Sequence, residues 1–254
     1  MFRFGNLSKH KVIQHFISDR SGGVSPAPYN TLNIGFNTKD APENVIKNRE
    51  ILAIKSCFDL NALTTVKQTH SGNVILVNAD IKGRGALDYD SALHDADALV
   101  TNLRKVPIMV QVADCVPILL FDPVNNVIAA VHAGWRGTLL HIAAKTVEKM
   151  SSSFGSDPLN LIAGIGPSIG PCCYEVGKEV VDKAADMMPF IYNKKGKPYF
   201  DLWESNKAQL MNSGVRSSNI EVSGICTMDN SDLYFSSRAG KGITGRFAAC
   251  IELI

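Results

Sequence analysis

Apolar runs and short polar breaks alternate through the centre of the chain. Three such runs lie between residues 106 and 131, and they are separated by Ala113-Asp114-Cys115 and by the segment DPVNN at 122–126. Continuous apolar runs of this length are typical of buried strands. The second break combines Asp-Pro with Asn-Asn, which favours a turn. The pattern therefore predicts that the second and third runs form a β-hairpin.

Two other segments have the apolar spacing of helices. In 40–56, Val45, Ile46, Ile51 and Leu52 recur at roughly helical intervals, and Pro42 suits the first turn. In 136–155 the apolar positions also fit a period of 3.6, and Gly155 is placed to end a helix. One helix is expected in each segment.

Short β-branched runs at 64–78 and 95–102 predict strands or strand ends. A strand, a loop and a helix are expected over 160–188, and further strands over 219–253. The first 36 residues are polar and rich in turns, which indicates an ordered loop lying over another part of the molecule. Strands thus come in groups with about four helices between them. We predict an α+β (mixed α/β) fold in a single domain spanning 1–254, because no linker divides the chain.

Composition narrows the function. The chain has 254 residues, 45% of them hydrophobic, and 26 basic against 24 acidic side chains, so there is no basic field for nucleic acid. No apolar run is long enough to span a membrane, and the N-terminus lacks the pattern of a signal peptide. The six cysteines show no CxxC spacing, which argues against a disulfide framework or a zinc finger. We expect a soluble protein of the reducing cytoplasm, with the adjacent Cys172 and Cys173 packed rather than reactive.

Three residues stand where an apolar run breaks: His70, Cys115 and His132. The predicted hairpin would bring Cys115 and His132 face to face near its open end. A thiol between apolar runs is nevertheless most often a small buried hydrophobe. Asp114 and His94 are equally available by composition, so the residues alone favour a metal site only weakly. His10, His15 and His141 are expected on the surface or in helices.

The stretch VHAGWRGT at 131–138 has two interpretations. Gly134 and Gly137 can permit a tight turn from a strand into a helix, which local chemistry favours. Alternatively, the helix N-terminus and Arg136 can bind an anion such as phosphate or carboxylate.

Several motifs resemble one known family in type and order. They are RSGGVS, NTLNIG, KNREIL, KQTHSGNV, DADALVT, ADCVPILLFDP, VHAGWRGT, GPSIGPCCYEVG and ITGRFAACIEL, and they cover the chain from about Ser18 to Leu253. The family is the laccase-domain family, whose members are also described as polyphenol oxidases, purine nucleoside phosphorylases and peptidoglycan editing factors. The resemblance implies a sandwich-like mixed α/β fold, akin to that of cysteine hydrolases. It also implies phosphorolysis of adenosine, inosine and methylthioadenosine, with deamination of adenosine as a further activity.

The resemblance further implies one zinc ion held by His70, Cys115 and His132. Three protein ligands leave a fourth position open, as in catalytic zinc sites. Copper is less expected, because three ligands cannot house several copper ions. The chain departs from many relatives at 236–242, where it reads SSRAGKG and keeps one arginine, Arg238.

Substrate-binding residues follow as hypotheses. Arg49 and Arg136 are candidates for holding phosphate, and Gln68 and Asp97 are candidates for orienting groups. Two other functions stay open. Cys115 could be the nucleophile of a Cys-His hydrolase or amidase acting on a peptidoglycan precursor, or the zinc could be purely structural. Metal content distinguishes these functions, because one thiolate cannot easily be both a permanent zinc ligand and a nucleophile.

Overall fold

The computed structural model describes all residues from 1 to 254. The helices are α1 (Pro42–Ser56), α2 (Trp135–Leu139), α3 (Ile142–Phe154), α4 (Lys178–Val181) and α5 (Leu202–Asn212). The strands are β1 (Ile13–Ile17), β2 (Thr64–Thr65), β3 (Val74–Leu76), β4 (Ala98–Thr101), β5 (Ile108–Val112), β6 (Val116–Asp122), β7 (Val127–Ala133), β8 (Ile162–Ile165), β9 (Ile191–Lys194), β10 (Lys197–Phe200), β11 (Ile220–Val222) and β12 (Phe247–Leu253).

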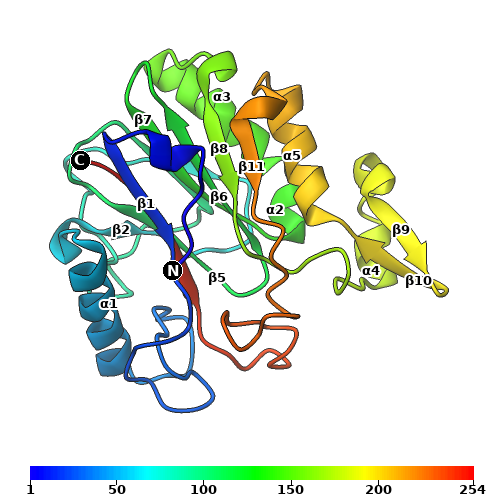
Figure 1. Cartoon of the computed structure of the whole chain (residues 1–254), viewed down its shortest axis with the longest axis horizontal. Helices are drawn as coiled ribbons and strands as arrows, with labels where there is room; N and C mark the ends of the chain where they lie inside the picture. The colour runs from blue at the N-terminus through cyan, green and yellow to red at the C-terminus, as the bar shows by residue number, and fades with distance from the viewer.

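Two mixed sheets form the body of the molecule (Figure 1). The larger has the strand order β11-β8-β6-β7-β4-β3 and the smaller has the order β1-β12-β5-β2, while β9 and β10 pair separately. Both large sheets contain parallel and antiparallel neighbours; β3 runs parallel to β4, for example, whereas β6 runs antiparallel to β7. The expected mixed α/β fold is confirmed.

Alternation along the strands sorts the core into three apolar clusters. On β6, Leu119 and Phe121 pack toward the smaller sheet, whereas Ile118 and Leu120 pack toward α3 and α5. On the far side of the smaller sheet, Met109 of β5 packs with residues of α1. Because successive strand residues point to opposite faces, each sheet is apolar on both faces. The result is a sandwich of two sheets with helices outside each.

The predicted hairpin forms. Strands β6 and β7 pair antiparallel around the 122–126 turn, with Val116 opposite Ala133 and Pro117 opposite His132. Cys115 directly precedes β6, and His132 lies near the end of β7. The turn is closed locally by Asp122, whose carboxylate accepts N–H groups of Val124 and Asn125.

The helix α1 agrees with prediction, whereas the segment 136–155 does not form one helix. It is divided into α2 and α3 at His141, whose φ of 58° is left-handed. This backbone conformation cannot continue a right-handed helix. His141 is therefore a junction residue and not a residue within a helix. Gly155 does end α3, with a φ of 69°.

The N-terminal region differs in part from the expected loop. It contains β1, which pairs with β12 at the edge of the smaller sheet. His15 of β1 is buried, in contrast to the surface position expected for it. The loop that follows does lie over the molecule, because Leu32 and Ile34 are buried against the smaller sheet and α1. No helix of the structure has the length and apolar character needed to cross a membrane.

Four connections carry the chain from one large sheet to the other, and two of them come close together at one end of the sandwich. Residues 113–115 link β5 of the smaller sheet to β6 of the larger, and residues 66–73 link β2 of the smaller sheet to β3 of the larger. Both connections contain a residue with positive φ, Asp114 at 89° and His70 at 61°. Polar side chains thus gather at the end of the sandwich where the sheets are joined.

Candidate metal centre and ligand cavity

The three predicted ligands meet at this end of the sandwich. The potential ligand atoms of His70, Cys115 and His132 all lie within 4.8 Å of one another. Cys115 Sγ lies 3.9 Å from His70 Nε2, and the two imidazole rings face each other edge to face with centroids 4.9 Å apart. Their convergence follows from the fold, because one ligand comes from β7 and the other two come from the connections between sheets.

Asp97 fixes the orientation of His132. The Nδ1 of His132 lies 2.7 Å from a carboxylate oxygen of Asp97, which is fully buried. This contact leaves Nε2 as the ring nitrogen available to a metal, an arrangement common behind metal-bound histidines. Burial by itself lowers the pKa of His132, but the Cys115 and Asp97 charges outweigh it and raise the pKa to about 9.

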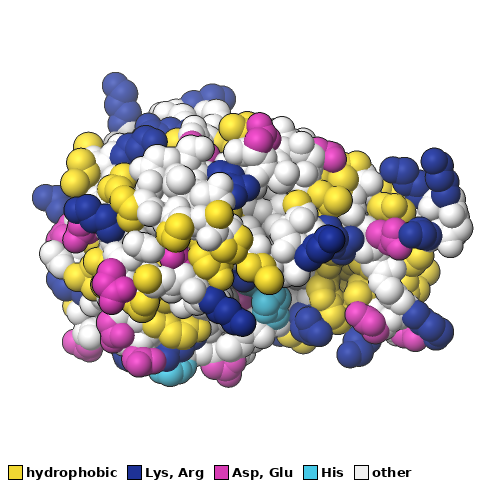
Figure 2. All heavy atoms as spheres, turned by 90° about the horizontal axis from the view of Figure 1, so that it is seen from below, with side chains coloured by type: hydrophobic (Ala, Val, Ile, Leu, Met, Phe, Trp, Pro, Cys, Tyr) yellow, Lys and Arg dark blue, Asp and Glu magenta, His cyan; other side chains and the backbone are white.

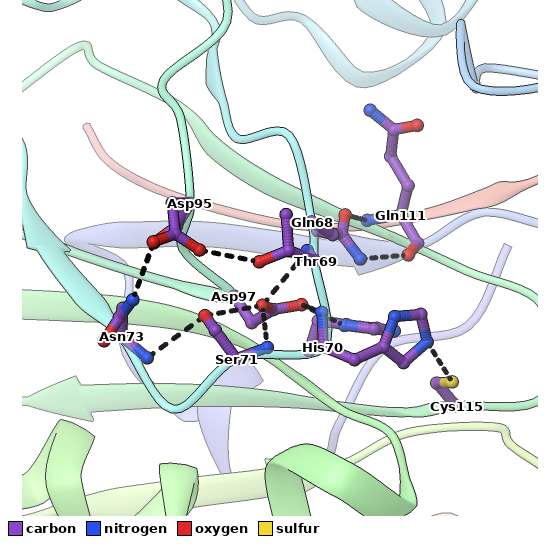
Figure 3. Close-up of polar contacts among 10 residues, drawn as sticks. Gln68, Thr69, His70, Ser71, Asn73, Asp95, Asp97, Gln111 and Cys115 are labelled. Carbon is purple, nitrogen blue, oxygen red and sulfur yellow. Dashed lines mark hydrogen bonds and ion pairs between the residues drawn. The ribbon is translucent and has the colours of Figure 1, made fainter.

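The same carboxylate also holds the loop that carries His70. It accepts the backbone N–H groups of Thr69, His70 and Ser71 at 3.2, 3.0 and 2.6 Å, and the Ser71 hydroxyl as well (Figure 3). Asp97 is therefore a positioning residue for both histidines. Burial opposes its ionisation, yet the bonds from His132 and Ser71 lower the pKa of Asp97 below its ordinary value.

Cys115 is half-buried and lies beside both imidazoles. Burial alone raises the pKa of the Cys115 thiol, whereas the charge and hydrogen bonds of His132, and then those of His70, lower it to about 6. Without a metal, the geometry favours a thiolate next to an imidazolium. A thiolate is also the form in which cysteine binds metals.

Gly134 provides the space for this cluster. A Cβ atom at this position would lie 2.9 Å from Cys115 Sγ and 3.0 Å from His70 Cδ2. Its φ of −71° is open to any residue, so the glycine is needed for close approach and not for a special turn. At Gly137 the nearest atom to such a Cβ lies 3.4 Å away, an ordinary contact. The two glycines of the 131–138 stretch therefore differ in role.

A cavity of about 580 Å³ opens beside the cluster. This volume is in the range of small-molecule sites. Its lining residues are Asn37, Gln68, His70, Gln111, Val112, Ala113, Asp114, Cys115, His132, Ile169, Tyr174, Ser237, Arg238, Lys241, Gly242 and Arg246. Figure 2 shows the molecule from below, with a histidine side chain beside a hollow and Lys and Arg side chains around it.

Three cations of one C-terminal segment line the cavity: Arg238, Lys241 and Arg246. Nη1 of Arg246 donates to the carbonyls of Thr244 and Gly245, and its other guanidinium N–H groups are unpaired. Sequence analysis singled out only Arg238 from this segment. The clustering of three basic residues within 238–246 was the available signal.

Asp114 holds this cationic segment against the ligand connection. Its buried carboxylate accepts the backbone N–H of Arg238 and the hydroxyl of Thr227, both at 2.6 Å. Asp114 is therefore next to the cluster as a structural acceptor, although composition alone left it as a candidate ligand. His94, the other such candidate, belongs to neither the cluster nor the cavity lining.

The predicted substrate residues lie in different places. Gln68 lines the cavity, but its amide is paired with the backbone N–H and carbonyl of Gln111 at 2.8 Å each. Arg49 is 1% exposed and donates to the carbonyls of Ile34, Gly85 and Ala86, which makes it a structural residue of α1. Arg136 is exposed and stacks on Trp135, and it does not line the cavity. The structure thus brings neither Arg49 nor Arg136 to the cavity, because burial and helix orientation direct them elsewhere.

The donor set fits a zinc ion. Two imidazole nitrogens and one thiolate are ligands typical of zinc, and the three converge with the cavity on their open side. Asp97 supplies the outer hydrogen bond that metal-bound histidines usually make. Zinc in proteins usually has four ligands, so these three would leave one position for a further ligand.

The sheet sandwich thus places a candidate metal centre of two histidines and a cysteine beside a cationic cavity of the size of a small-molecule site. Residues 14–254 match the family described as multi-copper polyphenol oxidoreductase laccase. The chain belongs to this family, the laccase-domain family, as its motifs indicated.

Curated relatives and solved structures agree over nearly the whole chain. Purine nucleoside phosphorylase YlmD of Bacillus subtilis is 37% identical, covering 98% of this chain and 91% of the relative. Adenosine deaminase RL5, from an unknown prokaryotic organism, is 36% identical over 85% of this chain and 87% of its own. The crystal structure of YlmD from Geobacillus stearothermophilus has a TM-score of 0.92 at 34% identity, covering 96% and 92% of the two chains. The family's curated relatives thus carry the names of enzymes.

Proposed function

We propose that this protein is a purine nucleoside phosphorylase with one zinc ion held by His70, Cys115 and His132. The observation that carries the proposal is that the three-ligand cluster opens directly onto a cavity lined by three cations. Two curated relatives that are 37% and 35% identical to this chain are named purine nucleoside phosphorylases, which supports the proposal. We propose adenosine, inosine and methylthioadenosine as substrates. Each is an uncharged purine nucleoside, and the site must bind it together with the phosphate anion.

Phosphate is assigned to the cationic side of the cavity. Arg246 offers unpaired guanidinium N–H groups, and Arg238 and Lys241 add positive charge on the same segment. Arginine matches the oxygen spacing of phosphate with paired donors. Asp114 supports this subsite by fixing the backbone of Arg238.

The reaction requires phosphate to approach C1′ of the ribose. An oxygen of phosphate forms a bond to C1′ while the bond from C1′ to N9 of the purine breaks. The electron pair of the broken bond leaves with the purine, which takes up a proton, and the products are the free base and ribose 1-phosphate. The cations hold the nucleophile in position, which lowers the entropy cost of bringing two reactants together. When bound, zinc supplies a Lewis acid at the edge of the cavity.

Deamination of adenosine is proposed as a second activity of the same site. In this reaction water adds its oxygen at C6 of the purine and ammonia leaves, giving inosine. The adenosine deaminase name of a relative with 36% identity supports this assignment. It needs no phosphate, so the two activities separate by their dependence on phosphate.

Product analysis tests the proposed function. Zinc-loaded protein is incubated with adenosine, with and without phosphate, and the products are separated by chromatography. Adenine and ribose 1-phosphate that form only with phosphate are expected, together with a smaller phosphate-independent yield of inosine. Failure to form either product at any zinc level would contradict the proposal.

Arg246→Ala tests the phosphate subsite. Loss of a charge-assisted contact costs roughly 1.5–3 kcal/mol, so the phosphate KM should rise by roughly 10- to 100-fold with a smaller change for adenosine. Arg136→Ala is the matched control, because Arg136 stacks on Trp135 outside the cavity lining. An equal rise of the phosphate KM in both variants would count against this subsite.

A Cys-His hydrolase acting on a peptidoglycan precursor is the second candidate. The contact of His132 with Asp97 and the low pKa of Cys115 favour it, because nucleophilic cysteines use such neighbours. Metal-free protein that is alkylated at Cys115 in step with the loss of amide hydrolysis would support this candidate. If Cys115→Ser loses both its zinc and its phosphorolysis activity, the result supports the phosphorylase.

All six cysteines are unpaired, which supports the proposal of a reducing, cytoplasmic compartment.

A further inference from the structure

A second group of metal-binding side chains lies outside the cavity lining. Cys172, Cys173, Cys226 and Asp229 place three sulfur atoms and a carboxylate within 4.8 Å of one another. We call these four residues the thiol cluster. We propose that the thiol cluster is a second metal site, which binds one thiophilic divalent cation, with Zn²⁺ as its occupant.

Asp229 bridges the two adjacent thiols. Cys172 Sγ lies 3.1 Å from one carboxylate oxygen and Cys173 Sγ lies 3.1 Å from the other. In a tetrahedral zinc site with bonds of about 2.3 Å, neighbouring sulfur ligands are separated by roughly 3.8 Å. All four ligand atoms of the thiol cluster lie within 4.8 Å of one another, so small side-chain rotations would enclose a cation. Three sulfur atoms and one oxygen form a donor set suited to zinc.

Cys226 is held in the manner of a metal ligand. It is 5% exposed, and its sulfur accepts the backbone N–H of Gly170 at 3.3 Å. A β-bridge between Ser168 and Cys226 keeps the two loops in parallel register. Hydrogen bonds from outer groups orient metal ligands and stabilise their charged forms. The backbone of Gly170 also packs tightly beside the cluster, since a Cβ there would lie 2.9 Å from the Trp203 ring and 3.1 Å from Cys172 Sγ.

Positive groups surround the two adjacent cysteines. Lys194 donates to the carbonyl of Cys172 at 3.3 Å, and a guanidinium N–H of Arg238 reaches the carbonyl of Cys173 at 3.5 Å. Three thiolates, one carboxylate and a divalent cation sum to a charge of about −2, from the ordinary charges of these groups. The neighbouring cations offset this charge, as a filled site requires.

The contacts between the thiols and the carboxylate of the metal-free cluster are weak hydrogen bonds. The thiols of Cys172 and Cys173 both point at the carboxylate of Asp229, and thiols are weak hydrogen-bond donors. Binding of Zn²⁺ would replace the thiol protons by sulfur–zinc bonds and release those protons to solvent, with no oxidation or reduction.

A cation here would fasten one wall of the cavity. The segment that contains Cys172 and Cys173 also carries Ile169 and Tyr174, which line the cavity. Cys226 and Asp229 belong to the separate loop after β11. The second metal would thus hold a cavity wall to that loop, a structural role distinct from the centre at His70.

Metal content of matched variants tests the proposal. Protein is prepared under reducing conditions, loaded with Zn²⁺, freed of unbound metal and measured by plasma mass spectrometry, with circular dichroism to verify folding. The wild type should hold about two zinc ions per chain, since each three- or four-ligand set binds one. Cys173→Ser combined with Asp229→Asn should lose one ion, and Cys115→Ser should lose the other. Cys57→Ser is the matched control and should keep both, because Cys57 is exposed and belongs to neither group.

Cobalt provides an independent reading that does not depend on activity. Co²⁺-loaded protein should show a sulfur-to-cobalt absorption band that persists in Cys115→Ser and is largely lost in the Cys173→Ser, Asp229→Asn variant. One zinc ion in the wild type and none in Cys115→Ser would overturn the second site, as would alkylation of Cys172 and Cys173 at equal rates with and without zinc. One ion that is lost only in the thiol-cluster variant would instead support this site and count against zinc at His70.

Discussion

Gly134 shows how a single missing side chain can make room for a candidate metal centre. The residue lies between Cys115 and His70, and its backbone conformation is an ordinary one. The requirement for glycine is therefore spatial. This distinguishes Gly134 from Gly137 three residues later, although sequence alone presents both as glycines of the same turn.

Gly134→Ala should disrupt the centre while leaving the fold intact. The added Cβ would come within 2.9 Å of Cys115 Sγ, so the thiol or the backbone must move. We expect zinc affinity to fall by at least about 10-fold, in line with other losses of ligand orientation. Competition with a chromophoric chelator measures the affinity.

Gly137→Ala is the matched control for that experiment. Its Cβ would meet only ordinary contacts, and alanine in a helix is favoured over glycine by roughly 0.5–1 kcal/mol. Zinc affinity should be unchanged and stability equal or slightly higher. A similar loss of zinc in both variants would show that the glycines act through backbone freedom instead.

Arg49 illustrates what sequence cannot tell at the residue scale. As a cation in a polar helix it was a reasonable phosphate ligand, but the fold buries it against the carbonyls of Ile34, Gly85 and Ala86. These partners lie up to 37 positions away in the sequence. The candidate metal ligands could be proposed because each stands where an apolar run breaks and because the motifs resemble a known family, whereas the cations of 238–246 reach the cavity only through long-range packing.

At the scale of elements, local chemistry was the reliable guide. The β6–β7 hairpin follows from Asp122 and the Asn pair in its turn, which close hydrogen bonds among near neighbours. The break between α2 and α3 was missed, because the apolar period continues on both sides of His141 while the backbone of His141 is left-handed. The sequence also could not predict that Cys226 lies beside the segment of Cys172, because this proximity depends on the β-bridge between Ser168 and Cys226.

The packing of β1 makes stability depend on pH through His15. Its Nε2 accepts the backbone N–H of Phe4 at 2.9 Å, which requires a neutral ring. Burial, and then the charge of Arg3, lower the pKa of His15 to about 4. The unfolded chain binds this proton near pH 6.5, so unfolding takes up a proton between pH 6.5 and 4. The free energy of unfolding should therefore decrease as the pH is lowered from 6.5 to 4, by about 3 kcal/mol at most.

His15→Gln isolates this contribution, because the glutamine oxygen can accept the same N–H without titrating. Urea unfolding at several values between pH 7 and 4.5 should show a steeper loss of stability in the wild type than in the variant. Carboxylates contribute equally to both proteins. His94→Gln, which replaces an exposed histidine, should run parallel to the wild type. Parallel curves for all three proteins would exclude His15 as the source.

At the scale of the whole molecule, we propose that residues 1–254 form one folding unit. The chain crosses between the two sheets through 66–73 and 113–115, and a continuous apolar cluster fills the space between them. Neither sheet could separate from the other without exposing that cluster. A single cooperative transition is the expected consequence.

Unfolding curves from two spectroscopic probes test whether the chain is one folding unit. Trp135 and Trp203 lie on the helical side of the larger sheet, so their fluorescence reports that side, while far-ultraviolet circular dichroism reports all elements. In metal-saturated protein the two midpoints should agree. Phe121→Ala, in the layer between the sheets, should lower both midpoints together through a loss of about 3–5 kcal/mol. Two resolved transitions would indicate separate domains.

The origin of the three ligands also sets an order of events in time. Cys115 and His132 lie at the open end of a hairpin whose strands are joined by the four residues 123–126, a local structure of the kind that forms quickly. His70 reaches them only after the chain has completed the parallel pairing of β3 with β4, which closes a much longer loop. We therefore expect two of the proposed ligands to come together before the third. A metal ion that arrived early would meet an incomplete set of ligands, and we expect firm binding only once the two sheets have joined.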